Sequence, residues 1–161
     1  MIWIRKLVTY SIILCLISAC TGQGEAIPEG YYPYEKDEVK QAVESLSFQP
    51  ELPSYVPILA EVLVTDQFYI GETEAFDISL FTVENDILTI QMINDEMAVN
   101  EDKANKVEMN GNIPGYYVNE KYSKKLTWEK AGITYEITYR ASEKELDKRD
   151  FIQVANSFRP H

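Results

Sequence analysis

Histidine and cysteine are scarce in this chain of 161 residues, which contains one histidine and two cysteines. The histidine, His161, is the last residue, and a side chain at a chain end is rarely held in a fixed geometry. Ser-His-Asp and Cys-His catalysis require a histidine base beside the nucleophile, and structural zinc sites require several histidines or cysteines. HExxH, P-loop and GxSxG motifs are also absent. We therefore predict a protein that is not an enzyme, has no catalytic residues, and binds no cofactor and no metal through histidine or cysteine.

Basic residues are also few. The chain has 15 Lys and Arg against 26 Asp and Glu, which gives a net charge of -11. An acidic surface repels nucleic acid and anionic lipid headgroups. No nucleic acid is therefore expected among the partners, and residence at a membrane must rest on something other than a basic patch.

No apolar run is long enough to cross a bilayer. Residues 7–16 are apolar, but they make up about half of the ~20 residues that a spanning helix needs. The run follows the basic pair Arg5 and Lys6 and precedes two small residues and Cys20. That order is typical of a cleaved secretory signal. With a cysteine at the cleavage point, the first 20 residues resemble the signal of a bacterial lipoprotein.

This resemblance implies that Cys20 receives a diacylglyceryl group on its sulfur and becomes the first residue of the mature chain. Two acyl chains hold a protein at a membrane stably, whereas one chain holds it only marginally. The expected localisation is the cell membrane, lipid-anchored and facing the extracytoplasmic side. The alternative is an ordinary secreted protein in which the cysteine falls at this position by chance.

Three parts are predicted along the chain: a lipoprotein signal peptide over 1–19, the lipidated cysteine and a flexible tether over 20–36, and a single domain over 37–161. Residues 21–30 are rich in glycine and lack apolar periodicity. As a coil, a tether of this length reaches about 15–20 Å.

A helix is predicted at each end of the domain. Apolar residues at helical spacing predict the first helix over 37–46, and three prolines predict that 48–57 is extended. Asp147 is a suitable N-cap for the second helix, with Asp150 at the third helical position. A capping box that begins at Ser142 is the alternative start, one turn earlier.

Between the helices the apolar period changes to two, which is typical of strands. The alternation predicts strands from 61 onward and over 75–84, 87–93, 106–109, 113–119, 126–130 and 133–140, with residues 94–106 as a long polar loop or sheet rim. Asn110-Gly111 and Ala131-Gly132 predict turns. The resulting class is α+β: an antiparallel β-sheet meander of about six to seven strands, with a short N-terminal helix and a C-terminal helix packed on one face.

Three stretches together resemble a known family: residues 48–57, 126–135 and 151–158. Their order is similar to that of a domain of unknown function (the 4367 type) in extracytoplasmic proteins and lipoproteins of Gram-positive bacteria. In that family a proline-rich segment precedes a meander, a hairpin with tryptophan, glycine and tyrosine, and a closing helix. The resemblance implies this fold and this compartment, and it brings no catalytic residues.

Aromatic residues are abundant, with 11 Tyr, 6 Phe and 2 Trp. Tyr31, Tyr32 and Tyr34 precede the first periodic segment, and such rings can stack on sugars or line an apolar groove. We take these three as a candidate interaction surface, and the alternative is that they belong to the core. Three other aromatic residues are predicted to be packing residues: Trp128, Tyr135 and Tyr139.

Carboxylates form two further candidate sites. The loop over 94–106 carries four that could hold Ca²⁺, although a solvated acidic rim is the simpler interpretation: Asp95, Glu96, Glu101 and Asp102. Three others could supply a hydrolytic pair, although nothing in the sequence fixes their separation: Glu72, Glu74 and Asp77.

The function predicted from these observations is a non-catalytic, lipid-anchored extracytoplasmic binding module, whose partner is a cell-envelope protein or a wall polymer. One alternative is a carrier or sensor in which a curved sheet holds a lipid or another apolar ligand. The other is an acid-catalysed hydrolase of the cell wall. A dry cavity between sheet and helices would favour the carrier, and two facing carboxylates would favour the hydrolase.

Overall fold

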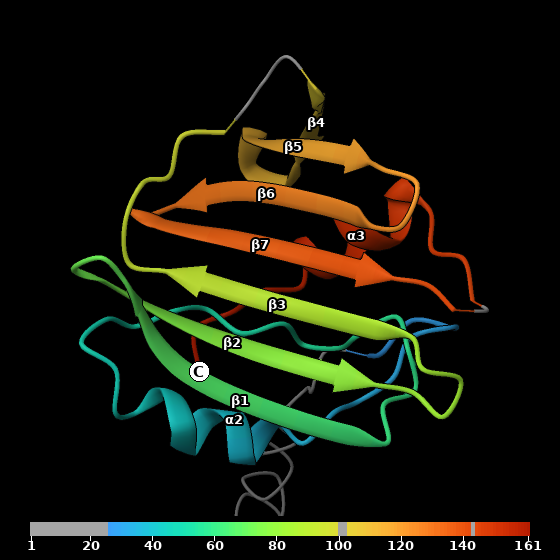
Figure 1. The fold of residues 1–161 in the computed structure, drawn as a ribbon, viewed down its shortest axis with the longest axis horizontal. Helices are drawn as coiled ribbons and strands as arrows, with labels where there is room; N and C mark the ends of the chain where they lie inside the picture. The colour runs from blue at the N-terminus through green and yellow to red at the C-terminus, as the bar shows by residue number, and fades with distance from the viewer. Residues whose placement is uncertain (1–25, 100–102, 143) are drawn as a thin grey trace, which may run out of the picture.

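The computed structural model describes residues 26–99, 103–142 and 144–161, so the predicted signal peptide and Cys20 lie outside the described residues. The described chain forms one seven-stranded antiparallel sheet with helices against one face (Figure 1). The elements are α2 (Lys36–Val43), β1 (Val62–Ile70), β2 (Thr73–Phe81), β3 (Ile87–Ile93), β4 (Asn105–Met109), the 3₁₀ turn η2 (Asn110–Asn112), β5 (Ile113–Asn119), β6 (Lys124–Lys130), β7 (Ile133–Arg140) and α3 (Lys148–Ala155). This arrangement confirms the predicted α+β class. No helix of the described part has the length and hydrophobicity needed to cross a bilayer.

The order of strands in the sheet is β1-β2-β3-β7-β6-β5-β4. The chain therefore builds two local meanders, β1 to β3 and β4 to β7, which join where β3 pairs with β7. Between them the chain crosses from β3 to the far edge of the sheet, past three strands and over about 19 Å. The long polar loop predicted around residue 100 is this crossover, and the yellow-green trace on the left of Figure 1 follows it.

One face of the sheet forms the core because alternate strand residues point to the same side. A row of aliphatic side chains runs in register across four strands, and each is at most 1% exposed: Ile78, Ile90, Ile137 and Leu126. The buried valines of α2 and the buried Phe151 and Val154 of α3 belong to the same cluster. Both helices therefore cover the same face, as the sequence pattern predicted.

The predicted packing role of the strand aromatics is confirmed. Trp128 of β6 stacks on Tyr135 of β7, with ring centroids 5.2 Å apart and planes 9° apart. Phe158, which follows α3, meets both rings edge-on at 5.0 and 5.4 Å. Tyr139 is also buried.

The two helix predictions differ in accuracy. Helix α3 begins after Asp147, as predicted, because the Asp147 carboxylate accepts hydrogen bonds from the backbone N–H groups of Arg149 and Asp150. The alternative start at Ser142 is wrong. Helix α2 ends at Val43, one turn before the predicted end, where the Ser45 hydroxyl donates to a backbone carbonyl of the helix.

The proline-rich segment over 48–57 is extended, as predicted, and it forms two isolated β-bridges. Leu52 pairs with Arg159 near the chain end, and Val56 pairs with Tyr32. The packed part of the chain therefore begins at residue 31, before the predicted domain boundary at residue 37.

The aromatic cluster should dominate the stability of the closing segment. Phe158→Ala removes a ring that contacts both Trp128 and Tyr135, so we expect a loss of about 3–5 kcal/mol in the free energy of unfolding. Urea denaturation measures this loss. Tyr122→Ala is the control and should change little, since Tyr122 is 76% exposed. A small loss for Phe158→Ala would mean that the closing segment is not docked on the sheet.

Candidate functional site

Two of the three candidate tyrosines are tied into the fold by their hydroxyl groups. The Tyr31 hydroxyl donates to a carboxylate oxygen of Asp150 at 3.1 Å, and its ring meets Tyr55 edge-on. The Tyr34 hydroxyl donates to the Pro53 carbonyl oxygen at 2.8 Å. Burial raises the pKa of both phenols, and the carboxylate of Asp150 adds to the effect at Tyr31. Both tyrosines therefore help to hold the N-terminal segment against the domain.

Tyr32 occupies a different environment. Its backbone pairs with Val56 through two hydrogen bonds of 2.8 and 3.0 Å, which fix its position. Its ring lies at the surface, 5.6 Å from the ammonium group of Lys144, which donates to the Pro57 carbonyl oxygen at 2.6 Å. Tyr32 is thus held by its main chain, and its side chain is half-buried.

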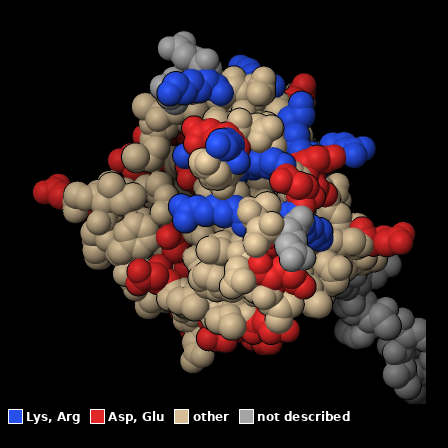
Figure 2. All heavy atoms as spheres, turned by 45° about the vertical axis from the view of Figure 1, so that its right-hand side comes forward, with Lys and Arg blue, Asp and Glu red and all other residues tan. Residues whose placement is uncertain are grey.

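The ring of Tyr32 lines a surface pocket of about 420 Å³. Leu59 and Val83 form apolar walls of this pocket and are 62% and 63% exposed. A second pocket of about 240 Å³ shares Glu61 with the first and is lined by the Tyr34 ring. We call these two adjoining pockets the Glu61 groove. The side that carries the β2–β3 turn appears in Figure 2, where acidic and basic side chains lie among uncharged ones.

Three carboxylates line the larger pocket, those of Glu61, Glu84 and Asp86, and the carboxylate of Asp86 has a structural role. Asp86 is 2% exposed, and its carboxylate accepts a hydrogen bond from the backbone N–H of Ser142. Its own backbone N–H donates to the Thr82 hydroxyl at 3.1 Å, which shapes the β2–β3 turn. Asp86 therefore supports the shape of the groove.

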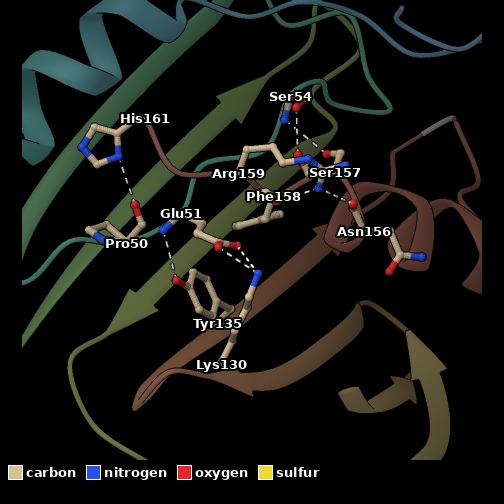
Figure 3. Close-up of polar contacts among 10 residues, drawn as sticks. All are labelled: Pro50, Glu51, Ser54, Lys130, Tyr135, Asn156, Ser157, Phe158, Arg159 and His161. Atoms are coloured by element: carbon tan, nitrogen blue, oxygen red, sulfur yellow. Dashed lines mark hydrogen bonds and ion pairs between the residues drawn. The ribbon is translucent and has the colours of Figure 1, made fainter. Parts of the chain in front are cut away.

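His161 is held in place, so the expectation that this side chain lacks a fixed geometry is wrong. Its Nδ1 lies 3.1 Å from the Pro50 carbonyl oxygen (Figure 3). It lines a pocket of about 200 Å³ in which Lys130 and Glu51 form an ion pair at 2.7 Å. The residues that line this pocket include no serine, threonine or cysteine, so the histidine has no nucleophile there to activate.

The proposed hydrolytic pair is contradicted by the sheet. Glu74 and Asp77 lie three residues apart on β2, so their side chains point to opposite faces. Glu74 accepts hydrogen bonds from the Ser47 backbone N–H at 2.8 Å and from Gln67 at 2.6 Å, and the bonds from Ser47 lower its pKa. Glu72 is exposed in the β1–β2 turn. Glu74 and Asp77 therefore cannot act as a pair on one substrate.

Two of the four loop carboxylates lie in the described chain. Asp95 accepts a hydrogen bond from the Glu96 backbone N–H at 2.8 Å, while Glu101 and Asp102 lie outside the described residues. No group of three or more metal-ligating side chains occurs within the described ranges.

The Glu61 groove joins four separate stretches of the chain: residues 32–35, 58–63, 80–86 and Lys144. Of the three candidate tyrosines, Tyr32 lines the larger pocket of the groove and Tyr34 lines the smaller one, whereas Tyr31 lines neither. The sequence patterns did not predict the other walls of the groove. Val83, an apolar residue beside the Asn85-Asp86 turn, could have indicated one of them. No protein-family model matches this chain, and no match was found among curated proteins or solved structures.

A pair of matched substitutions separates the two tyrosines of the groove. Tyr34→Phe leaves the Pro53 carbonyl without its donor, so we expect the free energy of unfolding to fall by about 1–3 kcal/mol. Tyr32→Phe should change it by less than about 0.5 kcal/mol, because the Tyr32 hydroxyl makes no hydrogen bond within the described chain. Chemical denaturation of both variants provides the measurement. Equal losses would show that Tyr32 serves the fold as much as Tyr34 does.

Proposed function

We propose that this protein is a non-catalytic binding module, anchored through lipidated Cys20 to the outer face of the cell membrane, which binds its partner in the Glu61 groove. The observation that carries the proposal is the exposed apolar wall formed by Leu59 and Val83 beside the ring of Tyr32. Concave sites that combine an apolar wall with polar groups are typical of ligand binding.

The position of the groove supports a role at the membrane. One wall is formed by Tyr32 and Tyr34, which follow residues 21–30, the glycine-rich part of the proposed tether. A tether of about ten residues reaches about 15–20 Å as a coil. The groove would then lie close to the bilayer surface, where a cell-envelope protein or a wall polymer can reach it.

Packing supports the binding module over the two alternatives. The core face between the sheet and the helices is filled by aliphatic rows and by the Trp128, Tyr135 and Phe158 cluster, which disfavours a large interior ligand. The separation of Glu74 and Asp77 on opposite faces disfavours acid-catalysed hydrolysis. We further propose that the chain belongs to the family of extracytoplasmic domains that its motifs resemble.

Lipidation is tested at the proposed modification site. Cys20→Ser removes the thiol, so the variant should lose labelling by a fatty-acid probe and leave the membrane fraction, or remain unprocessed. Cys15→Ser is the matched control and should keep both the label and the location. Continued labelling of the Cys20→Ser variant would refute the lipoprotein assignment.

Binding in the groove is tested by photo-crosslinking in cells. A benzophenone amino acid placed at position 32 should give discrete adducts, and the double variant Leu59→Glu, Val83→Glu should abolish them, because charge in an apolar wall disfavours binding. The same amino acid at position 122 is the control, since Tyr122 is exposed and does not line the groove. If both positions give the same adducts, or position 32 gives none, the groove is not the binding site.

A further inference from the structure

Strand β1 forms an open edge of the sheet. All nine of its residues pair with β2, from Val62 opposite Phe81 to Ile70 opposite Thr73. Among the described residues, no hydrogen bond joins the β1 backbone to any segment other than β2. Figure 1 shows β1 as the outermost strand on this side of the sheet. Half of its N–H and C=O groups therefore point away from β2, and only another strand satisfies such a row in full.

The two edge strands of the sheet differ in how well they resist pairing with another strand. The opposite edge, β4, is five residues long and carries exposed Lys106 and Glu108, and short charged edges resist strand pairing. Strand β1 is longer, and its register with β2 is uninterrupted. It also displays apolar side chains that are 40–64% exposed: Val62, Val64, Tyr69 and Ile70.

The charge at this edge indicates what kind of strand would pair there. On the face away from the core, Asp66 lies opposite Asp77, and the row continues across β3 to Glu136 of β7. Lys125 pairs with Glu136 at 3.2 Å, but within the described chain no cation forms an ion pair with Asp66 or Asp77. One oxygen of Asp77 is buried and accepts no hydrogen bond there. The edge thus lacks a positive charge.

We propose that β1 accepts an extended segment of a partner protein as an additional strand, with an arginine or lysine opposite Asp66 that also reaches Asp77. Neighbouring strands lie about 4.8 Å apart, so a side chain opposite Asp66 passes over it toward Asp77. Main-chain hydrogen bonds would supply affinity, and the cation would supply specificity. This inference rests on one part of the proposed function, namely that the protein is a binding module. Val62 lines the Glu61 groove, so the added strand would run into it.

A second copy of the chain fits this edge poorly. Pairing between two β1 strands would bring the unneutralised Asp66 and Asp77 of both copies to one interface, and like charges across a strand pair are destabilising. Each copy also carries a net charge of -11. Burial and the neighbouring carboxylates already raise the pKa of Asp77, so further negative charge would oppose its ionisation more strongly.

Synthetic peptides test the proposal on the full-length protein in detergent. The probes are nine-residue peptides of alternating valine and threonine that differ only at the centre, which is arginine, glutamine or glutamate. We expect the arginine peptide to bind about tenfold or more tightly than the glutamine peptide, and the glutamate peptide to bind most weakly. Fluorescence anisotropy measures the affinities. The double variant Asp66→Asn, Asp77→Asn should lose the preference for arginine, whereas Glu108→Gln on β4 should retain it.

A backbone control separates strand addition from simple charge attraction. The arginine peptide N-methylated at alternate residues keeps its side chains but cannot donate along one edge, so its binding should be lost. Binding of the unmodified peptide should slow amide hydrogen exchange in residues 62–70. Equal binding of the methylated peptide, no binding by any peptide, or protection of 62–70 by self-association alone would overturn the proposal.

These outcomes are distinct from those of the proposed function. The variant Leu59→Glu, Val83→Glu removes groove binding but leaves the β1 edge intact, so it should still bind the arginine peptide and prefer it over the glutamine peptide. Loss of that preference in this variant would contradict an independent β1 site. If position 32 gives no adducts in the protein without these substitutions while the arginine peptide still binds, only the proposal that the groove is the binding site is overturned.

Discussion

The contact between the closing segment and the aromatic pair of β6 and β7 positions the extended segment over 48–57 and, through it, the walls of the groove. Phe158 packs against Trp128 and Tyr135, and the Tyr135 hydroxyl accepts a hydrogen bond from the Glu51 backbone N–H at 3.1 Å (Figure 3). The aromatic cluster thereby positions the extended segment, and Arg159 pairs with Leu52. The same segment then holds the Tyr34 hydroxyl and the Tyr32 backbone. The groove is therefore the far end of a series of contacts that begins in the core.

The sheet has two faces with separate roles. The core face is covered by both helices and by the extended segment, and it carries the aliphatic rows that stabilise the fold. The opposite face keeps its polar side chains, and part of it is covered by the crossover, where Thr134 donates to the Asp95 carbonyl oxygen at 2.7 Å. Unneutralised charge is found on this second face, toward the β1 edge. Stability thus depends on the side chains of one face, and the recognition that we propose depends on those of the other face.

Local patterns predicted the elements well, because local physics determines them. The alternation predicted β3 and β5 at their observed bounds, and the Asp147 cap predicted the start of α3. The opposite faces of Glu74 and Asp77 also follow from the strand period, so that pair could have been rejected from the sequence. The crossover to β4, the Glu61 groove and the fixed position of His161 depend on contacts between distant segments. Periodicity carries no information about such contacts.

The junction between β3 and β7 has a consequence for how the chain reaches its native state. Every other pairing in the sheet joins neighbours along the chain, whereas Ile90 of β3 and Ile137 of β7 are separated in sequence by β4, β5 and β6. Closing such a distant contact is slow compared with forming hairpins. Until it closes, the two halves each expose an unpaired apolar edge. We therefore expect this pairing to be the slowest step in the assembly of the sheet, with exposed strand edges open to mispairing before it.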